Sequence, residues 1–131
     1  MQQQYKAGGE RTVEVGGLRF VVMHRAIGED GGATIEVFGD VDGKAIQVLR
    51  FDCFRKGPHY HYDPTGKNRQ EKLDPAREDP LDWSFRQIRS NIPTMLRTAG
   101  FDALARQVDA GALGRDWTKV KDAVLASAPK A

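Results

Sequence analysis

The chain has 131 residues, which suits one domain with one modest core, and its 40% hydrophobic and 29% charged residues exclude an intrinsically disordered protein. Its 20 Lys and Arg against 18 Asp and Glu are too balanced to predict a nucleic-acid partner, and its single cysteine excludes an internal disulfide. No run approaches the roughly 18 apolar residues of a membrane span, and the N-terminus lacks the apolar core of a signal peptide, so we expect no membrane partner and a cytoplasmic location.

The first half of the chain has the pattern of a β-meander. Residues 1–9 are Gln-rich and end in two glycines, and we expect them to be flexible. Alternating apolar and polar residues then predict four strands, at 12–15, 18–26, 33–38 and 45–54. Turn signals rich in glycine and aspartate separate them. Because successive strands joined by tight turns pair antiparallel, we expect an antiparallel sheet of about four strands.

The composition changes after the fourth predicted strand. Residues 63–80 contain three prolines and many charges with almost no apolar content, which predicts a long surface loop. Helical spacing of apolar residues begins at Asp79-Pro80, a favourable cap and first-turn pair, and continues to residue 99. Pro93 lies inside this helix and should kink it, and Ile88 and Ile92 are expected in the core.

Two shorter helices are predicted at 102–110, ended by Gly111, and at 116–126, and we expect residues 127–131 to form a flexible tail. An amphipathic helix needs an apolar surface to cover, and a meander with one apolar face supplies it. The predicted fold class is therefore α+β, a single domain over residues 10–126 with its helix-rich C-terminal half packed on one sheet face.

Residues 58–63, with the sequence PHYHYD, contain the residue types most suited to chemistry. In an extended segment His59 and His61 point to the same face, about 7 Å apart. Two histidines at this spacing on a strand are typical of sites for a divalent transition metal. Asp63 is the nearest candidate for a third ligand. Further candidates are Asp52, Cys53 and Glu71.

The alternative interpretation is an edge strand without a cofactor. Its histidines would be exposed, and Tyr60 and Tyr62 would form a contact patch for a partner, because tyrosine combines apolar area with a polar tip. The other residues with reactive side chains are expected to be structural. His24 ends an apolar face and should be hydrogen-bonded, and Cys53 should be a small buried residue without reactivity.

Trp83 is the second candidate for a partner contact. At about 100° per residue, it lies off the apolar stripe of its helix, beside Arg86 and close to Arg89. A tryptophan next to arginine on a solvent-facing helix is typical of a protein interface. The alternative is that the 63–80 loop covers the indole.

The sequence shows no phosphate-binding loop, nucleophile elbow or other catalytic motif, so we expect a non-catalytic protein rather than an enzyme. Three hypotheses follow. The preferred one is a small binding or accessory module with a protein partner, as a subunit of a larger complex. The second is a metal-binding or small-molecule-binding protein centred on His59 and His61. The third is a homo-oligomeric structural protein that self-associates through its strands.

Overall fold

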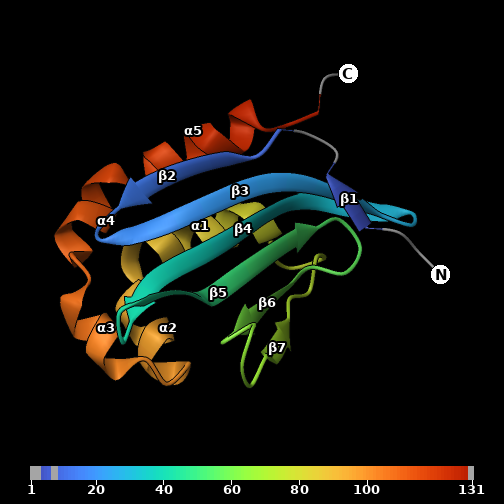
Figure 1. Cartoon of the computed structure of the whole chain (residues 1–131). Helices are drawn as coiled ribbons and strands as arrows, with labels where there is room; N and C mark the ends of the chain where they lie inside the picture. The colour runs from blue at the N-terminus through green and yellow to red at the C-terminus, as the bar shows by residue number, and fades with distance from the viewer. Residues whose placement is uncertain (1–3, 7–8, 130–131) are drawn as a thin grey trace.

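The computed structural model describes residues 4–6 and 9–129, and within them one antiparallel sheet is followed by a helical half (Figure 1). The strands are β1 (Gln4–Lys6), β2 (Arg11–Val15), β3 (Leu18–Ile27), β4 (Asp30–Val41), β5 (Lys44–Phe54), β6 (His59–Tyr62) and β7 (Arg69–Lys72). The helices are α1 (Pro80–Ser90), α2 (Ile92–Thr98), α3 (Asp102–Gln107), α4 (Ala110–Asp116) and α5 (Thr118–Ala126).

The sheet is a meander with one divided edge. Its strand order is β1-β3-β4-β5-β6-β7, and every pair is antiparallel. The edge of β3 is shared, because β2 pairs with its first half and β1 with its second half. The predicted four-strand meander corresponds to β2, β3, β4 and β5 and is confirmed, and β6 and β7 extend it.

The turn between β2 and β3 requires glycine. Gly16 and Gly17 both have positive φ, 63° and 84°, which glycine adopts without strain. At Gly16 a Cβ would also lie 2.8 Å from the Leu113 side chain and 2.9 Å from the Asp109 carbonyl oxygen. The Gly16 carbonyl accepts a hydrogen bond from the Asp109 amide at 3.0 Å, so this turn fixes the start of α4 against the sheet.

The core lies between one face of the sheet and the helices, as the fold class predicted. Phe20, Ile35 and Phe51 from the three central strands are fully or almost fully buried, and so are the predicted core residues Ile88 and Ile92. In Figure 1 the helices lie behind the sheet and along its edges, and the face toward the viewer carries no helix. We call this second surface the helix-free face.

The long helix predicted from residue 80 to residue 99 is two helices. α1 ends at Ser90, Asn91 has φ −134°, and α2 begins at Ile92. Pro93 therefore lies in the first turn of α2, where its missing N–H needs no partner, and the chain breaks instead of kinking. The expected end of a helix at Gly111 is wrong: α4 contains Gly111, because Asp109 caps it by accepting from the Ala112 amide at 3.0 Å.

The predicted 63–80 loop contains a strand. β7 pairs with β6, and its four residues are all exposed, so no apolar alternation marks it in the sequence. Within the segment that was expected to be flexible, Gln4–Lys6 form β1, while residues 1–3 and 7–8 lie outside the described part. In the expected tail, Ser127 is buried, and residues 130–131 lie outside the described part.

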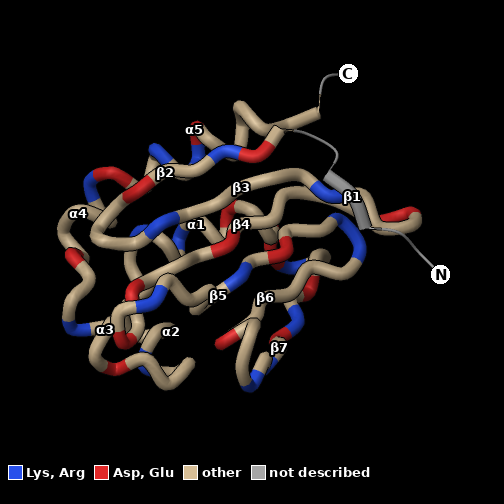
Figure 2. The backbone as a smooth tube through the Cα atoms, in the orientation of Figure 1, with Lys and Arg blue, Asp and Glu red and all other residues tan. Residues whose placement is uncertain are grey.

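Charged residues of both signs are interspersed along the strands and helices (Figure 2). No helix in the described part of the chain is long and apolar enough to cross a membrane.

Candidate metal centre

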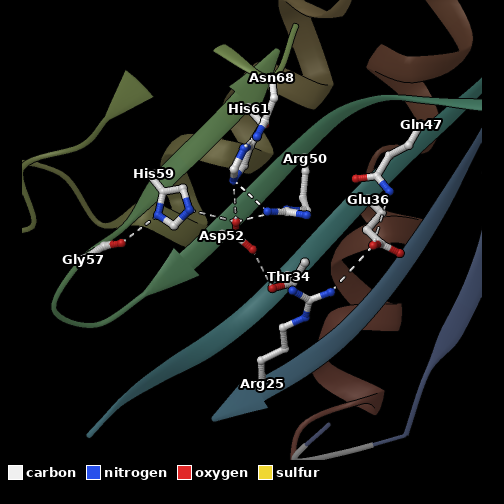
Figure 3. A network of polar contacts seen from close by, with 10 residues as sticks. All are labelled: Arg25, Thr34, Glu36, Gln47, Arg50, Asp52, Gly57, His59, His61 and Asn68. Carbon is white, nitrogen blue, oxygen red and sulfur yellow. Dashed lines mark hydrogen bonds and ion pairs between the residues drawn. The ribbon is translucent and has the colours of Figure 1, made fainter. Parts of the chain in front are cut away.

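The two predicted ligands lie on the helix-free face, where the sheet register gives them a carboxylate. Asp52 of β5 is the cross-strand partner of His59 in β6 and of Thr34 in β4. His61 is the partner of Arg50 in the next row. Because directly opposite residues share a face, the side chains of three neighbouring strands converge on Asp52 (Figure 3).

Asp52 is the centre of this cluster. Its Oδ2 atom lies 3.0 Å from His59 Nε2 and 3.1 Å from His61 Nε2. The side chains of Asp52 and His61 are 2% and 3% exposed, whereas His59 is 23% exposed and gives the cluster a route to solvent. One ligand atom from each of the three residues lies within 4.8 Å of the others, a separation that a bound metal ion can close by small side-chain rotations.

In each histidine, the ring nitrogen that does not face Asp52 contacts an oxygen of another residue, and this contact fixes the orientation of the ring. His59 Nδ1 lies 2.9 Å from the Gly57 carbonyl oxygen, which can accept but not donate, so Nδ1 carries a proton. His61 Nδ1 lies 2.7 Å from Asn68 Oδ1, which imposes the same tautomer. Both Nε2 atoms face Asp52, and a metal ion at this point would bind them in their unprotonated form. Metal-binding histidines are held by such outer acceptors.

Arg50 supplies a positive charge at the same centre. Its Nε donates to Asp52 Oδ2 at 3.1 Å, and its Nη2 donates to His61 Nε2 at 2.8 Å. A metal ion on His61 Nε2 therefore requires the guanidinium to turn away. Glu36, the cross-strand partner of Arg50 on β4, pairs with Arg25 at 3.7 Å and is the carboxyl group in the same row as the displaced guanidinium.

The electrostatics of the cluster favour a cation beside Asp52. Burial by itself would raise the pKa of Asp52, but its contacts with the Nε2 atoms of His59 and His61 and the charge of Arg50 hold that pKa well below its usual range. Thr34 also donates to Asp52 Oδ1, at 2.9 Å. The hydrogen bond to Asp52 raises the pKa of His59 above its ordinary value, although burial opposes this shift. The cluster can thus hold a proton or a metal ion between the carboxylate and the imidazoles.

The sequence suggested Asp63 as the nearest third ligand, but the structure brings Asp52 to the histidines. Asp63 has φ 52° in the turn after β6, and its Oδ2 accepts from the Lys67 amide at 2.9 Å. Of the other candidates, Cys53 lies on the helix-covered face with its Sγ 3.3 Å from Ser84 Oγ. Glu71 is the cross-strand partner of Tyr60 and not of a histidine.

The residues predicted to bind a partner lie away from this centre. The Tyr60 and Trp83 rings pack with centroids 4.7 Å apart, and Phe51 lies 6.2 Å from Trp83. Trp83 is thus half-buried, with its indole against Phe51 of β5 and Tyr60 of β6. Helical spacing alone did not predict these ring contacts, because it considers one helix and not the strands that pack on it.

The other predicted contact residues make local interactions. Tyr62 lies 5.5 Å from Tyr60 between ring centroids, with the Arg69 guanidinium over its ring, and burial raises the pKa of Tyr60 to about 12. Arg86 is paired with Glu78 and Asp82. Arg89 is exposed near the end of α1.

His24 and Cys53 have the structural roles that were expected. His24 Nδ1 lies 3.0 Å from Ser127 Oγ, and burial lowers the pKa of His24. Cys53 is buried, and this burial raises the pKa of its thiol to about 12.

We expect Cys53 to be almost unreactive in the native protein. At pH 8 a thiol with a pKa of about 12 is nearly all protonated, whereas an unfolded cysteine has a pKa of about 8.5. Labelling with dithiobis(nitrobenzoate) should be at least about a thousandfold slower in buffer than in urea. Complete labelling of the native protein within seconds would show that the thiol is accessible.

Comparison with known proteins places the chain in a family. No curated protein and no solved structure matches it. The model of a family described as a domain of unknown function, DUF7700, matches residues 12–124, which run from β2 into α5 and include Asp52, His59 and His61. The chain therefore belongs to the DUF7700 family.

Proposed function

We propose that the protein binds a divalent transition metal ion through His59 Nε2, His61 Nε2 and a carboxylate oxygen of Asp52. One observation carries the proposal: both histidines face Asp52 through Nε2 while an oxygen acceptor holds Nδ1. Without a metal, the Arg50 guanidinium and the proton that His59 shares with Asp52 compensate the carboxylate, and a metal ion would replace them. A metal ion at this point would use all three atoms as ligands.

The donor set favours particular ions. Imidazole nitrogen with a carboxylate oxygen suits zinc, iron(II) and related ions, whereas calcium and magnesium prefer oxygen ligands alone. Three protein ligands leave further coordination positions for water or another ligand. The competing occupant is Arg50, whose guanidinium contacts two of the ligands.

Zinc calorimetry at pH 7.5 tests the proposal. His59→Ala should weaken zinc binding by more than about 100-fold, because even the loss of an outer partner of a ligand costs roughly 10–100-fold. Zinc affinity should also fall as the pH is lowered through the raised pKa of His59, because the imidazole must lose its Nε2 proton to bind the metal. His24→Ala is the matched control: it removes the third histidine of the chain, on the helix-covered face, and should bind zinc as the wild type does.

Arg50→Gln should change zinc affinity in the opposite direction from His59→Ala. Two unit charges about 4 Å apart repel by about 1 kcal/mol even in water, so removing the guanidinium should raise zinc affinity at least about fivefold. Wild-type binding weaker than about 100 μM, or equal binding by wild type and His59→Ala, would contradict the metal proposal.

A protein partner, self-association and a cytoplasmic location stay predictions. The accessory-module hypothesis depended most on Trp83 as an exposed anchor, and the packing of Trp83 on Tyr60 removes that support. A partner that uses the helix-free face would be compatible with metal binding at Asp52.

A further inference from the structure

A hollow of about 350 Å³ lies directly beside the candidate metal centre. His59, one of the proposed ligands, forms part of its wall. The other lining residues come from the turn before β6 and from β7: Lys56, Gly57, Pro58, Gln70, Lys72 and Leu73.

The sheet register places this hollow on the same face as the metal centre. Lys72 is the cross-strand partner of His59, and Gln70 is the partner of His61. Directly opposite residues share a face, so the Lys72 and Gln70 side chains extend the two rows that contain Asp52 and Arg50. The volume is within the lower range of small-ligand pockets.

The wall of the hollow is electropositive. Two lysines line it, and no carboxylate is among its lining residues. Two carboxylates beside the turn before β6 have partners in that turn. Asp30 accepts from the backbone amides of Lys56 and Gly57, both at 2.9 Å, and Glu29 lies 3.6 Å from the Lys56 ammonium in a largely exposed pair. Lys72 is thus the cation most directly available to a ligand in the hollow.

The available donors favour a carboxylate over a phosphate group. Phosphate sites use several backbone amides or arginine side chains. Here the amides of Lys56 and Gly57 already bond to Asp30, and the Leu73 amide bonds to the Pro58 carbonyl oxygen. Among the lining residues, the Lys56 ammonium is shared with Glu29, which leaves the Lys72 ammonium and the Gln70 amide as donors for the few acceptor sites of a carboxylate.

We propose that this hollow binds a small carboxylate whose oxygen takes an open coordination position on the metal at Asp52, His59 and His61. The inference rests on the proposed metal binding and adds the chemical class of the ligand. Lys72 holds the carboxylate by its charge, and the Gln70 amide donates a hydrogen bond to it.

Cobalt-loaded protein, freed of excess ion, tests the inference through its visible absorption spectrum, with succinate as the probe. Succinate should change the cobalt bands at millimolar concentration or below, and the uncharged analogue succinamide should not. Lys72→Gln should weaken the effect of succinate about tenfold while changing cobalt affinity little, because a hydrogen bond to a charged group is worth about this much. Lys67→Gln, in the exposed turn after β6, is the matched control and should behave as the wild type.

The outcomes separate the two proposals. Cobalt binding that depends on His59, without any response to succinate, would overturn the carboxylate site and leave metal binding intact. Equal effects of Lys72→Gln and Lys67→Gln, or tighter binding of inorganic phosphate than of succinate, would also overturn it. Failure of cobalt and zinc to bind at all would overturn the metal site, and the carboxylate site with it.

Discussion

Asp52→Ala is expected to lower the free energy of unfolding of the metal-free protein by about 3–5 kcal/mol, the range found when one partner of a buried ion pair is removed. The carboxylate is almost fully buried and has polar contacts with Thr34, Arg50, His59 and His61. Without it, the positive charge of Arg50 and any proton on His59 lose their counter-charge on the same face.

Urea unfolding followed by circular dichroism measures this effect, and Glu36→Ala provides the matched control. Glu36 is the carboxylate of the neighbouring row on the same sheet face, where it pairs with Arg25 at 3.7 Å and burial raises its pKa. Its removal should cost less than about 1–2 kcal/mol, because it loses one long ion pair and one long hydrogen bond, whereas Asp52 has four polar partners. Equal losses in the two variants would show that Asp52 is not the centre of the polar network.

Zinc adds a second comparison for Asp52. A ligand at about 100 times its Kd stabilises the native state by about 2.7 kcal/mol. The wild type should gain this stability in excess zinc, whereas Asp52→Ala should gain almost none. A similar zinc-dependent gain in both proteins would place the zinc ion elsewhere on the chain.

The sheet could be predicted from local sequence because its signals are local. Apolar residues at alternate positions of Leu18–Ile27 and Lys44–Phe54 mark strands with a core-facing side, although parts of both strands are buried on both faces, and the glycines of the β2–β3 turn mark its position. β7 gave no such signal, because a fully exposed edge strand has no apolar side to alternate. The break at Asn91 was also missed, because the apolar stripe continues through it and only the backbone changes direction.

The site could be predicted only in part, because its third ligand comes from a different strand. Alternation within β6 correctly placed His59 and His61 on one face. Asp52 joins them through the register of β5 with β6, which depends on how residues 55–58 turn. A signal was nevertheless present: Arg50 and Asp52 are two charged residues at alternate positions of the otherwise apolar stretch Val48–Phe54. Such a pair indicates a polar feature on the strand face that points away from the core.

The second large loss of stability is expected in the core, on the opposite side of the sheet from Asp52. Ile88→Ala in α1 should lower the free energy of unfolding by about 2–5 kcal/mol, because the isoleucine is completely buried and its removal leaves a cavity between helix and sheet. Arg89→Ala, one residue further on and exposed, should change stability by less than about 0.5 kcal/mol. A denaturation midpoint shift equivalent to less than about 1 kcal/mol in Ile88→Ala would show that this stripe does not support the core.

Ile88→Ala also tests whether packing in the core affects the zinc affinity of the candidate metal centre. Ile88 lies on the helix-covered side, whereas Asp52, His59 and His61 lie on the helix-free face. Under conditions where Ile88→Ala is fully folded, its zinc affinity should equal that of the wild type, because no ligand or outer partner of a ligand is changed. A weaker zinc affinity in the folded variant would mean that the packing beneath β5 and β6 sets the geometry of the three ligands.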